Sequence, residues 1–151
     1  MPNGNALLFG SITALVLACG GSATDPGPGR RVSLALDRNN YSAGGDVSVM
    51  ITNLTELSLA YPGDFCPVSL QRFDAGSWVT VSGPPSGCAL FLGILLGKQS
   101  ARLVYHLPAE LRAGTYRLLL PAPWPERTQP TQADTPQATP EFTVDSKAFP
   151  T

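Results

Sequence analysis

An alternating segment, YSAGGDVSVMITN, spans Tyr41 to Asn53 and constrains the fold more than any other part of the chain. Successive side chains of an extended strand point to opposite sides of it. One side of this segment carries branched apolar residues, namely Val47, Val49 and Ile51. The other side carries Ser48, Met50 and Thr52. The alternation predicts a strand with one buried face, which a second layer of the protein must cover.

Short segments of the same kind recur at intervals of roughly ten residues, with turn-forming residues between them. The 15 Gly and 15 Pro disfavour long helices and favour such turns. The other predicted strands are Arg31–Asp37, Leu57–Tyr61, Cys66–Phe73, Trp78–Val81, Ala101–Leu107, Tyr116–Leu120 and Phe142–Val144, and Ala89–Leu96 is a further strand or strand-like segment. The pattern predicts an all-β chain folded as an antiparallel β-sandwich of about seven to eight strands.

Alternation also predicts which side chains face the core. The inward residues of the strand 101–107 are Ala101, Leu103, Tyr105 and Leu107. The outward residues are Arg102, Val104 and His106. Residues 89–96 are markedly apolar, which indicates a buried strand. Residues 121–140 are dominated by Pro, Thr and Gln and predict a long, poorly ordered loop.

The N-terminus carries an uncharged apolar run, ALLFGSITALVLA, at residues 6–18. A helix of this length rises only about 20 Å, which is too short to span a bilayer but suits a signal peptide. The run ends at Val16-Leu17-Ala18-Cys19, which resembles the bacterial lipobox. That resemblance implies that Cys19 is acylated and becomes the new N-terminus. Two alternatives remain open: the run is an ordinary secretory signal or a buried strand, and in both Cys19 is not acylated. The first five residues, MPNGN, also lack the Lys or Arg that a signal peptide usually carries there.

The lipobox divides the chain into a signal peptide (1–18), a tether (19–30), a folded domain (31–145) and a C-terminal tail (146–151). Gly rather than Asp follows Cys19, so retention in the inner membrane is not indicated. We therefore expect an exported protein anchored in the outer membrane through its N-terminal lipid, facing the periplasm or the cell surface. Two or three acyl chains make such an anchor stable.

Acylation of Cys19 leaves one pair of cysteines, Cys66 and Cys88. An exported chain folds in an oxidising compartment, so we expect the pair to form a disulfide. Closing a loop of about 22 residues stabilises the fold by roughly 3 kcal/mol in the chain-entropy account. The alternative is two separate buried thiols. A metal site fits poorly, because His106 is the only histidine and the spacing is no zinc pattern.

Composition and motifs exclude several classes of function. The net charge is −1 and the ten Lys and Arg are scattered, so no nucleic-acid partner is expected. No phosphate-binding loop occurs, and the carboxylates stand singly. A Cys–His pair of Cys66 or Cys88 with His106 needs a free thiolate, which the disulfide removes. We expect no enzyme activity, no cofactor and no metal.

Aromatic residues in or beside the predicted loops are the remaining candidates for a binding face for sugars or peptides. They are Tyr61, Phe65, Trp78 and Trp124. The favoured alternative is that Trp78 packs in the core and Trp124 pins the Pro-rich loop.

The order of these elements resembles bacterial immunoglobulin (Ig)-like domains over residues 31–145. The matching features are the turn and strand at 41–53, the Trp-containing hairpin at 70–81, the Ala-Gly-Thr-Tyr-Arg-Leu segment at 113–118 and the final Phe-Thr-Val. The resemblance implies that Tyr116 forms a tyrosine corner, with its hydroxyl bonded to upstream backbone. Together these observations predict a lipid-anchored, non-catalytic binding or assembly module with an unknown protein or glycan partner. The alternatives are a protein like the Ig-fold proteinase inhibitors, or an accessory domain of an extracytoplasmic hydrolase.

Overall fold

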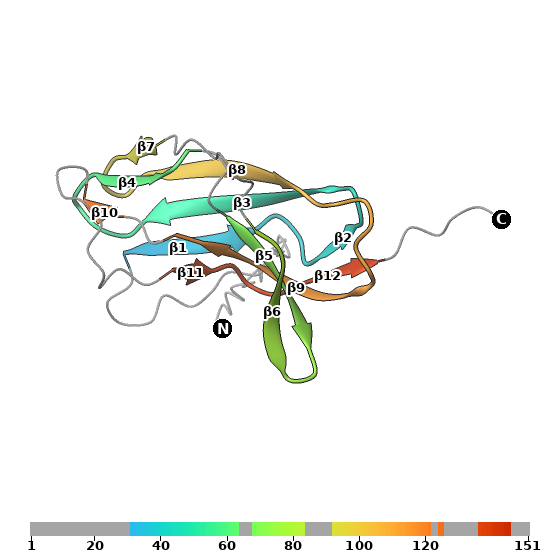
Figure 1. Cartoon of the computed structure of the whole chain (residues 1–151). Coiled ribbons are helices and arrows are strands. Elements are labelled where there is room, and N and C mark those ends of the chain that lie inside the picture. The colour runs from blue at the N-terminus through green and yellow to red at the C-terminus, as the bar shows by residue number, and fades with distance from the viewer. Residues whose placement is uncertain (1–30, 64–67, 84–91, 122–123, 126–135, 146–151) are drawn as a thin grey trace, which may run out of the picture.

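The computed structural model describes residues 31–63, 68–83, 92–121, 124–125 and 136–145 (Figure 1). These residues form strands joined by turns, and none of them belongs to a helix long and apolar enough to cross a membrane. The strands are β1 (Val32–Leu36), β2 (Asn40–Ser42), β3 (Asp46–Asn53), β4 (Leu59–Pro62), β5 (Ser69–Asp74), β6 (Ser77–Ser82), β7 (Leu92–Leu95), β8 (Ser100–His106), β9 (Gly114–Leu120), β10 (Trp124–Pro125), β11 (Gln137–Ala138) and β12 (Phe142–Asp145).

The first layer is an antiparallel sheet in the order β1-β3-β8. In it Val49 lies opposite Leu36 and Leu103, which places these apolar side chains on one face. Val47 and Val49 are completely buried, whereas Met50 on the other face is 40% exposed. The faces predicted for β3 and β8 are therefore confirmed, with Ser48 more buried than its outward position predicts.

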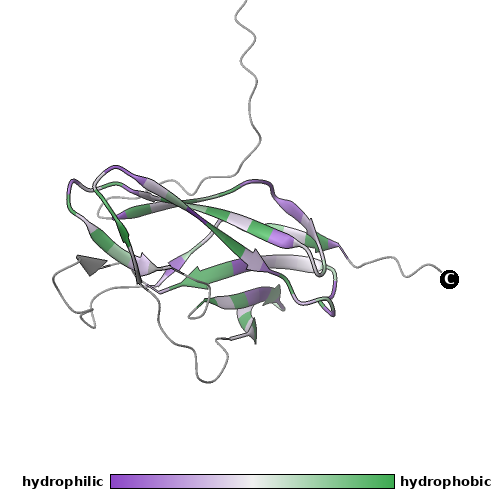
Figure 2. Ribbon diagram, turned by 90° about the horizontal axis from the view of Figure 1, so that it is seen from above, coloured by the Kyte–Doolittle hydropathy of each residue, from purple (hydrophilic) through white to green (hydrophobic). Residues whose placement is uncertain are grey.

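The second layer has the order β2-β12-β9-β5-β6, and β11 also pairs with β9. Neighbouring strands are antiparallel except for β2, which runs parallel to β12. Its inner face buries Leu118, Leu120, Phe142 and Val144. A smaller antiparallel sheet, β10-β4-β7, lies at the end of the sandwich where β1 begins (Figure 1). Apolar and polar residues alternate along many of the strands (Figure 2), as expected for layers that share one core.

The strand order is that of an Ig-like sandwich. β1, β3 and β8 correspond to strands A, B and E, and β12, β9, β5 and β6 to strands G, F, C and C′. The tyrosine corner is also present, because the Tyr116 hydroxyl donates a 2.6 Å hydrogen bond to the Arg112 carbonyl. The predicted fold class is thus confirmed.

Three expectations about individual segments are wrong. Trp78 lies half-buried on the outer face of the second layer, where its ring packs against Phe73 at 5.3 Å and under the Arg117 guanidinium at 4.2 Å. The apolar run before residue 97 is not wholly buried, since Ile94 is 46% and Leu96 is 51% exposed. The predicted loop contains β10 and β11, and Thr139 after β11 is buried and bonded to Leu118.

Tyr41, like Tyr116, is a buried tyrosine whose hydroxyl group is hydrogen-bonded. The hydrogen bonds of Tyr41 predict that the protein loses stability at alkaline pH. The Tyr41 hydroxyl lies 2.6 Å from Asp37 Oδ1 and 3.0 Å from the Arg38 carbonyl oxygen. Burial, and then the Asp37 carboxylate, raise the pKa of Tyr41 well above its ordinary value of 10.0. The contribution of the neutral hydroxyl is therefore complete below pH 10 and is lost as the pH rises toward the raised value, by about 1 kcal/mol at pH 11. Urea unfolding between pH 9 and pH 11 measures this loss. Tyr41→Phe should be less stable at pH 9 but should show a shallower alkaline decline, and an unchanged slope would contradict the assignment.

Candidate functional site

Asn53 organises the end of the sandwich where the described chain begins. Its side chain is completely buried at the last position of β3. The amide nitrogen lies within hydrogen-bond distance of three carbonyl oxygens, of Leu57 (2.7 Å), Leu95 (3.1 Å) and Leu96 (3.1 Å). The amide oxygen accepts from the Thr55 backbone N–H (2.9 Å) and hydroxyl (2.8 Å). One side chain thus joins the loop after β3 to the loop after β7.

The two loops also contact each other directly. The Lys98 backbone N–H donates to the Thr55 carbonyl (3.1 Å), and Lys98 Nζ donates to the Leu54 carbonyl (2.8 Å). A Cβ at Gly97 would lie 2.5 Å from the Glu56 carbonyl oxygen, so only glycine permits this approach. We call residues 53–57 and 95–98 the Asn53 clamp.

The clamp holds two leucines out in solvent. Leu57 is 64% exposed and Leu96 is 51% exposed, although the carbonyl oxygens of both bind the same buried amide nitrogen. Their backbones are therefore fixed close together while their side chains remain outside the core. Lys98 lies beside them and forms a 3.2 Å ion pair with Glu56. The arrangement is a rigid apolar projection with charged residues at its side.

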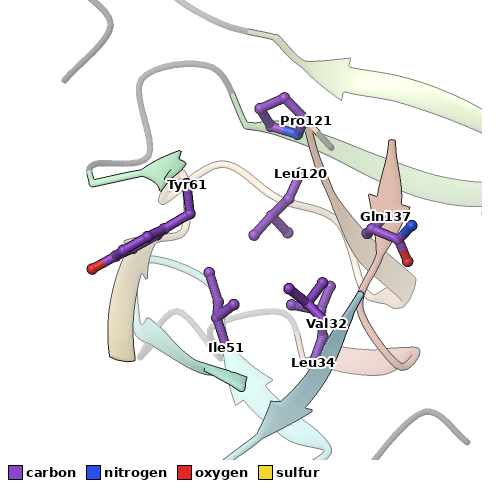
Figure 3. A pocket seen from close by; sticks show the side chains of 7 residues that line it. All are labelled: Val32, Leu34, Ile51, Tyr61, Leu120, Pro121 and Gln137. Atoms are coloured by element: carbon purple, nitrogen blue, oxygen red, sulfur yellow. The ribbon is translucent and has the colours of Figure 1, made fainter. Parts of the chain in front are cut away.

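An apolar hollow lies between the two layers, where Tyr61 of β4 meets residues of β1, β3 and β9 (Figure 3). It is lined by Val32, Leu34, Ile51, Tyr61, Leu120, Pro121 and Gln137, and its cavity volume is only about 10 Å³. Ligand pockets are usually larger, at about 300–1,000 Å³, and combine apolar walls with several convergent polar groups. This hollow offers one amide, that of Gln137. Its geometry suits a packing gap better than a ligand site.

The structure brings two of the predicted aromatic positions to this same end. Tyr61 is partly buried, lines the hollow, and packs over Gly93, where a Cβ would lie 2.7 Å from its ring. Trp124 stands in β10 directly opposite Ala60, the neighbour of Tyr61 in β4. Phe65 lies outside the described residues. So do Cys19, Cys66 and Cys88, and their lipidation and disulfide remain predictions.

His106 lies on the outer face of the first layer, as predicted. Its Nδ1 is 2.9 Å from Asp46 Oδ1, and both side chains are more than half exposed. On the same face Arg102 Nε donates to the Ser48 hydroxyl at 2.5 Å. The described part of the chain holds no group of three or more His, Cys, Asp or Glu side chains that could bind a metal ion. These contacts stabilise cross-strand pairs. They do not by themselves indicate a catalytic arrangement.

In the sequence, Asn53 is named only as the last residue of the predicted strand, and its burial is not predicted. Position 53 has the same parity as the buried positions 47, 49 and 51, so the alternation itself contained the signal. The following Thr55 fits as well, because an Asn side chain commonly bonds the backbone two residues onward. The exposed leucines carried no such signal.

No family model matches the sequence, and no curated protein matches it. Among solved structures, the fold is similar to a β-glucosidase from Listeria innocua in complex with gluconolactone (TM-score 0.35, 14% identity, 83% of this chain). This chain spans only 16% of that enzyme. It is also similar to the yjhA protein from Bacillus subtilis (TM-score 0.37, 18% identity, 82% of this chain and 95% of that one). A third similarity is to an ASH/PapD-like domain of human CEP192 (TM-score 0.37, 10% identity, 96% and 97%). These similarities are distant, and nothing about function follows from them.

Proposed function

We propose that the chain is a lipid-anchored protein of the bacterial cell envelope whose Ig-like domain acts by binding rather than by catalysis. The observation that carries the proposal is the sequence at residues 6–19, an apolar run of signal-peptide length ending in Ala18-Cys19. Acylated Cys19 would hold the protein in the outer membrane. We further propose that Cys66 and Cys88 form a disulfide in that oxidising compartment.

A binding role is supported by what the domain presents to solvent. The Asn53 clamp is a rigid loop pair with exposed leucines, and the β5–β6 hairpin projects from the rest of its sheet (Figure 1) with Phe73 and Val79 exposed. Surfaces of this kind are typical of recognition by shape and apolar contact. We propose a protein or a glycan of the envelope as the partner of the hairpin surface.

Substituting the lipidated cysteine tests the proposal. Cells fed a clickable fatty acid should label the wild-type chain, and Cys19→Ser should carry no label and should move to the soluble fraction after a carbonate wash. The wash matters because it releases proteins held only at the surface of the membrane. A Cys66→Ser, Cys88→Ser double variant is the matched control and should keep its label. Label that persists in Cys19→Ser would exclude the proposed anchor.

A further inference from the structure

We propose that the Asn53 clamp is a docking surface for the headgroup layer of an anionic lipid bilayer, so that the anchored domain rests on the membrane by this end. The proposal rests on the anchoring proposed above. The clamp is the part of the fold beside which the described chain begins, because the Leu54 N–H donates a 2.9 Å hydrogen bond to the Arg31 carbonyl. The stretch from Cys19 to Arg31 is at most about 40 Å long when fully extended. The clamp therefore stays within tens of ångströms of an acylated Cys19.

The chemistry of the clamp suits the interface of a bilayer. Leu57 and Leu96 offer exposed apolar side chains on backbones held close together by Asn53, and Ile94 is exposed two residues before Leu96. Lys98 is more than half exposed and carries the charge that anionic headgroups attract, and its 3.2 Å ion pair with the exposed Glu56 offsets part of that attraction. Peripheral binding strength grows with buried apolar area and with such electrostatic attraction.

The buried amide of Asn53 explains how a loop can enter this layer. Backbone groups moved out of water cost free energy unless they are already hydrogen-bonded. The carbonyl groups of Leu57, Leu95 and Leu96 have their donor within the protein, in Asn53. The leucine side chains can therefore leave water without stripping hydrogen bonds from the backbone that carries them.

Vesicle flotation of the chain from residue 20 to 151 tests the docking without the lipid anchor. This chain contains every described core residue, since those residues lie between Val32 and Val144. We expect it to float with dioleoylphosphatidylglycerol vesicles and only weakly with dioleoylphosphatidylcholine vesicles. Leu57→Ser combined with Leu96→Ser should weaken binding about tenfold or more, because two apolar side chains no longer leave water.

Two comparisons separate docking from damage to the fold. Met50→Ser combined with Val104→Ser removes two similarly exposed apolar side chains from the outer face of β3 and β8, and should change binding less than about twofold. Glu56→Gln removes the acid paired with Lys98 and should tighten binding to anionic vesicles about fivefold. The gain should be confined to anionic vesicles, because a damaged fold exposes apolar surface and would bind both kinds of vesicle more tightly.

Equal flotation of the clamp variant and the wild-type chain, or no flotation with anionic vesicles at all, would overturn the docking proposal. The second result, joined to crosslinking of position 57 to an envelope protein, would assign the surface to a protein partner instead. Neither result bears on acylation, which the fatty-acid label reports separately. Conversely, vesicle binding by the 20–151 chain, joined to the absence of fatty-acid label on the wild-type chain in cells, would support docking and exclude the anchor.

Discussion

Replacing Asn53 by Ala is expected to lower the free energy of unfolding by about 3 kcal/mol. The substitution removes the donor shared by the carbonyl groups of Leu57, Leu95 and Leu96, and the acceptor used by Thr55. A buried polar group left without its partner costs about 1–3 kcal/mol, and the second donors of the Leu57 and Leu96 carbonyl groups, the Thr55 hydroxyl and the Gln99 N–H, offset part of the sum. Equilibrium urea unfolding of the purified domain measures the difference.

The neighbouring Thr52→Ala is the matched control. The Thr52 hydroxyl bonds the exposed Ser100 hydroxyl at 2.8 Å, so its loss should cost about 0.5 kcal/mol. Asn53→Asp keeps an acceptor for Thr55 but turns a carboxylate oxygen toward carbonyl oxygens. At pH 7 it should be no more stable than Asn53→Ala, and it should regain stability at low pH as the carboxyl group is protonated. A loss below 1 kcal/mol for Asn53→Ala would show that the loops are held by other contacts.

The layers of this fold could be predicted from sequence because their signal is local. Val47, Val49 and Ile51 alternate with polar residues, and a strand with one apolar face can bury it only against another layer. The faces of β8 followed from the same reasoning. The short strands β10 and β11 could not be predicted, because two residues are too few to display a period.

Trp78 shows where apolar character misleads. The hairpin between β5 and β6 turns through Ala75 and Gly76, both with positive φ, and this turn sets Phe73 opposite Trp78. Since Leu70 faces the core, Phe73 and Trp78 must face outward. The strand register that the turn sets therefore places the Trp78 ring on the outer face, although the apolar character of the ring favours the core.

The clamp could be predicted only in part for a different reason. Parity could have placed the Asn53 side chain inside. Two of the carbonyl groups that it binds, those of Leu95 and Leu96, lie some forty residues away in sequence, and a contact over that separation has no local signature. The exposure of Leu57 likewise depends on the folded loop in which Asn53 holds its backbone, and the local sequence does not show it. A sequence pattern reports which residues prefer the core, whereas an exposed leucine held in place by hydrogen bonds appears only in three dimensions.

Phe142→Ala is expected to have the largest effect on stability of any single substitution considered, about 3–5 kcal/mol. Phe142 is 1% exposed and lies between both buried tyrosines, with ring centroids 5.2 Å from Tyr41 and 6.2 Å from Tyr116. Its strand β12 lies between the edge strand β2 and β9 in the second layer and pairs with both. Truncation to Ala therefore leaves a cavity and loosens both tyrosine contacts at once. Urea unfolding measures the loss, and amide exchange should show whether β2 and β12 open together.

Two further variants decide whether packing is the cause. Phe142→Leu keeps most of the apolar volume and should cost only about 1–2 kcal/mol. Glu141→Ala changes an exposed residue beside it and should be neutral within about 0.5 kcal/mol. If Phe142→Leu is as unstable as Phe142→Ala, the aromatic contacts rather than the filled volume hold the strand. If all three variants lie within 1 kcal/mol of the wild-type protein, β12 is not part of the cooperative core, and the second layer ends at β9.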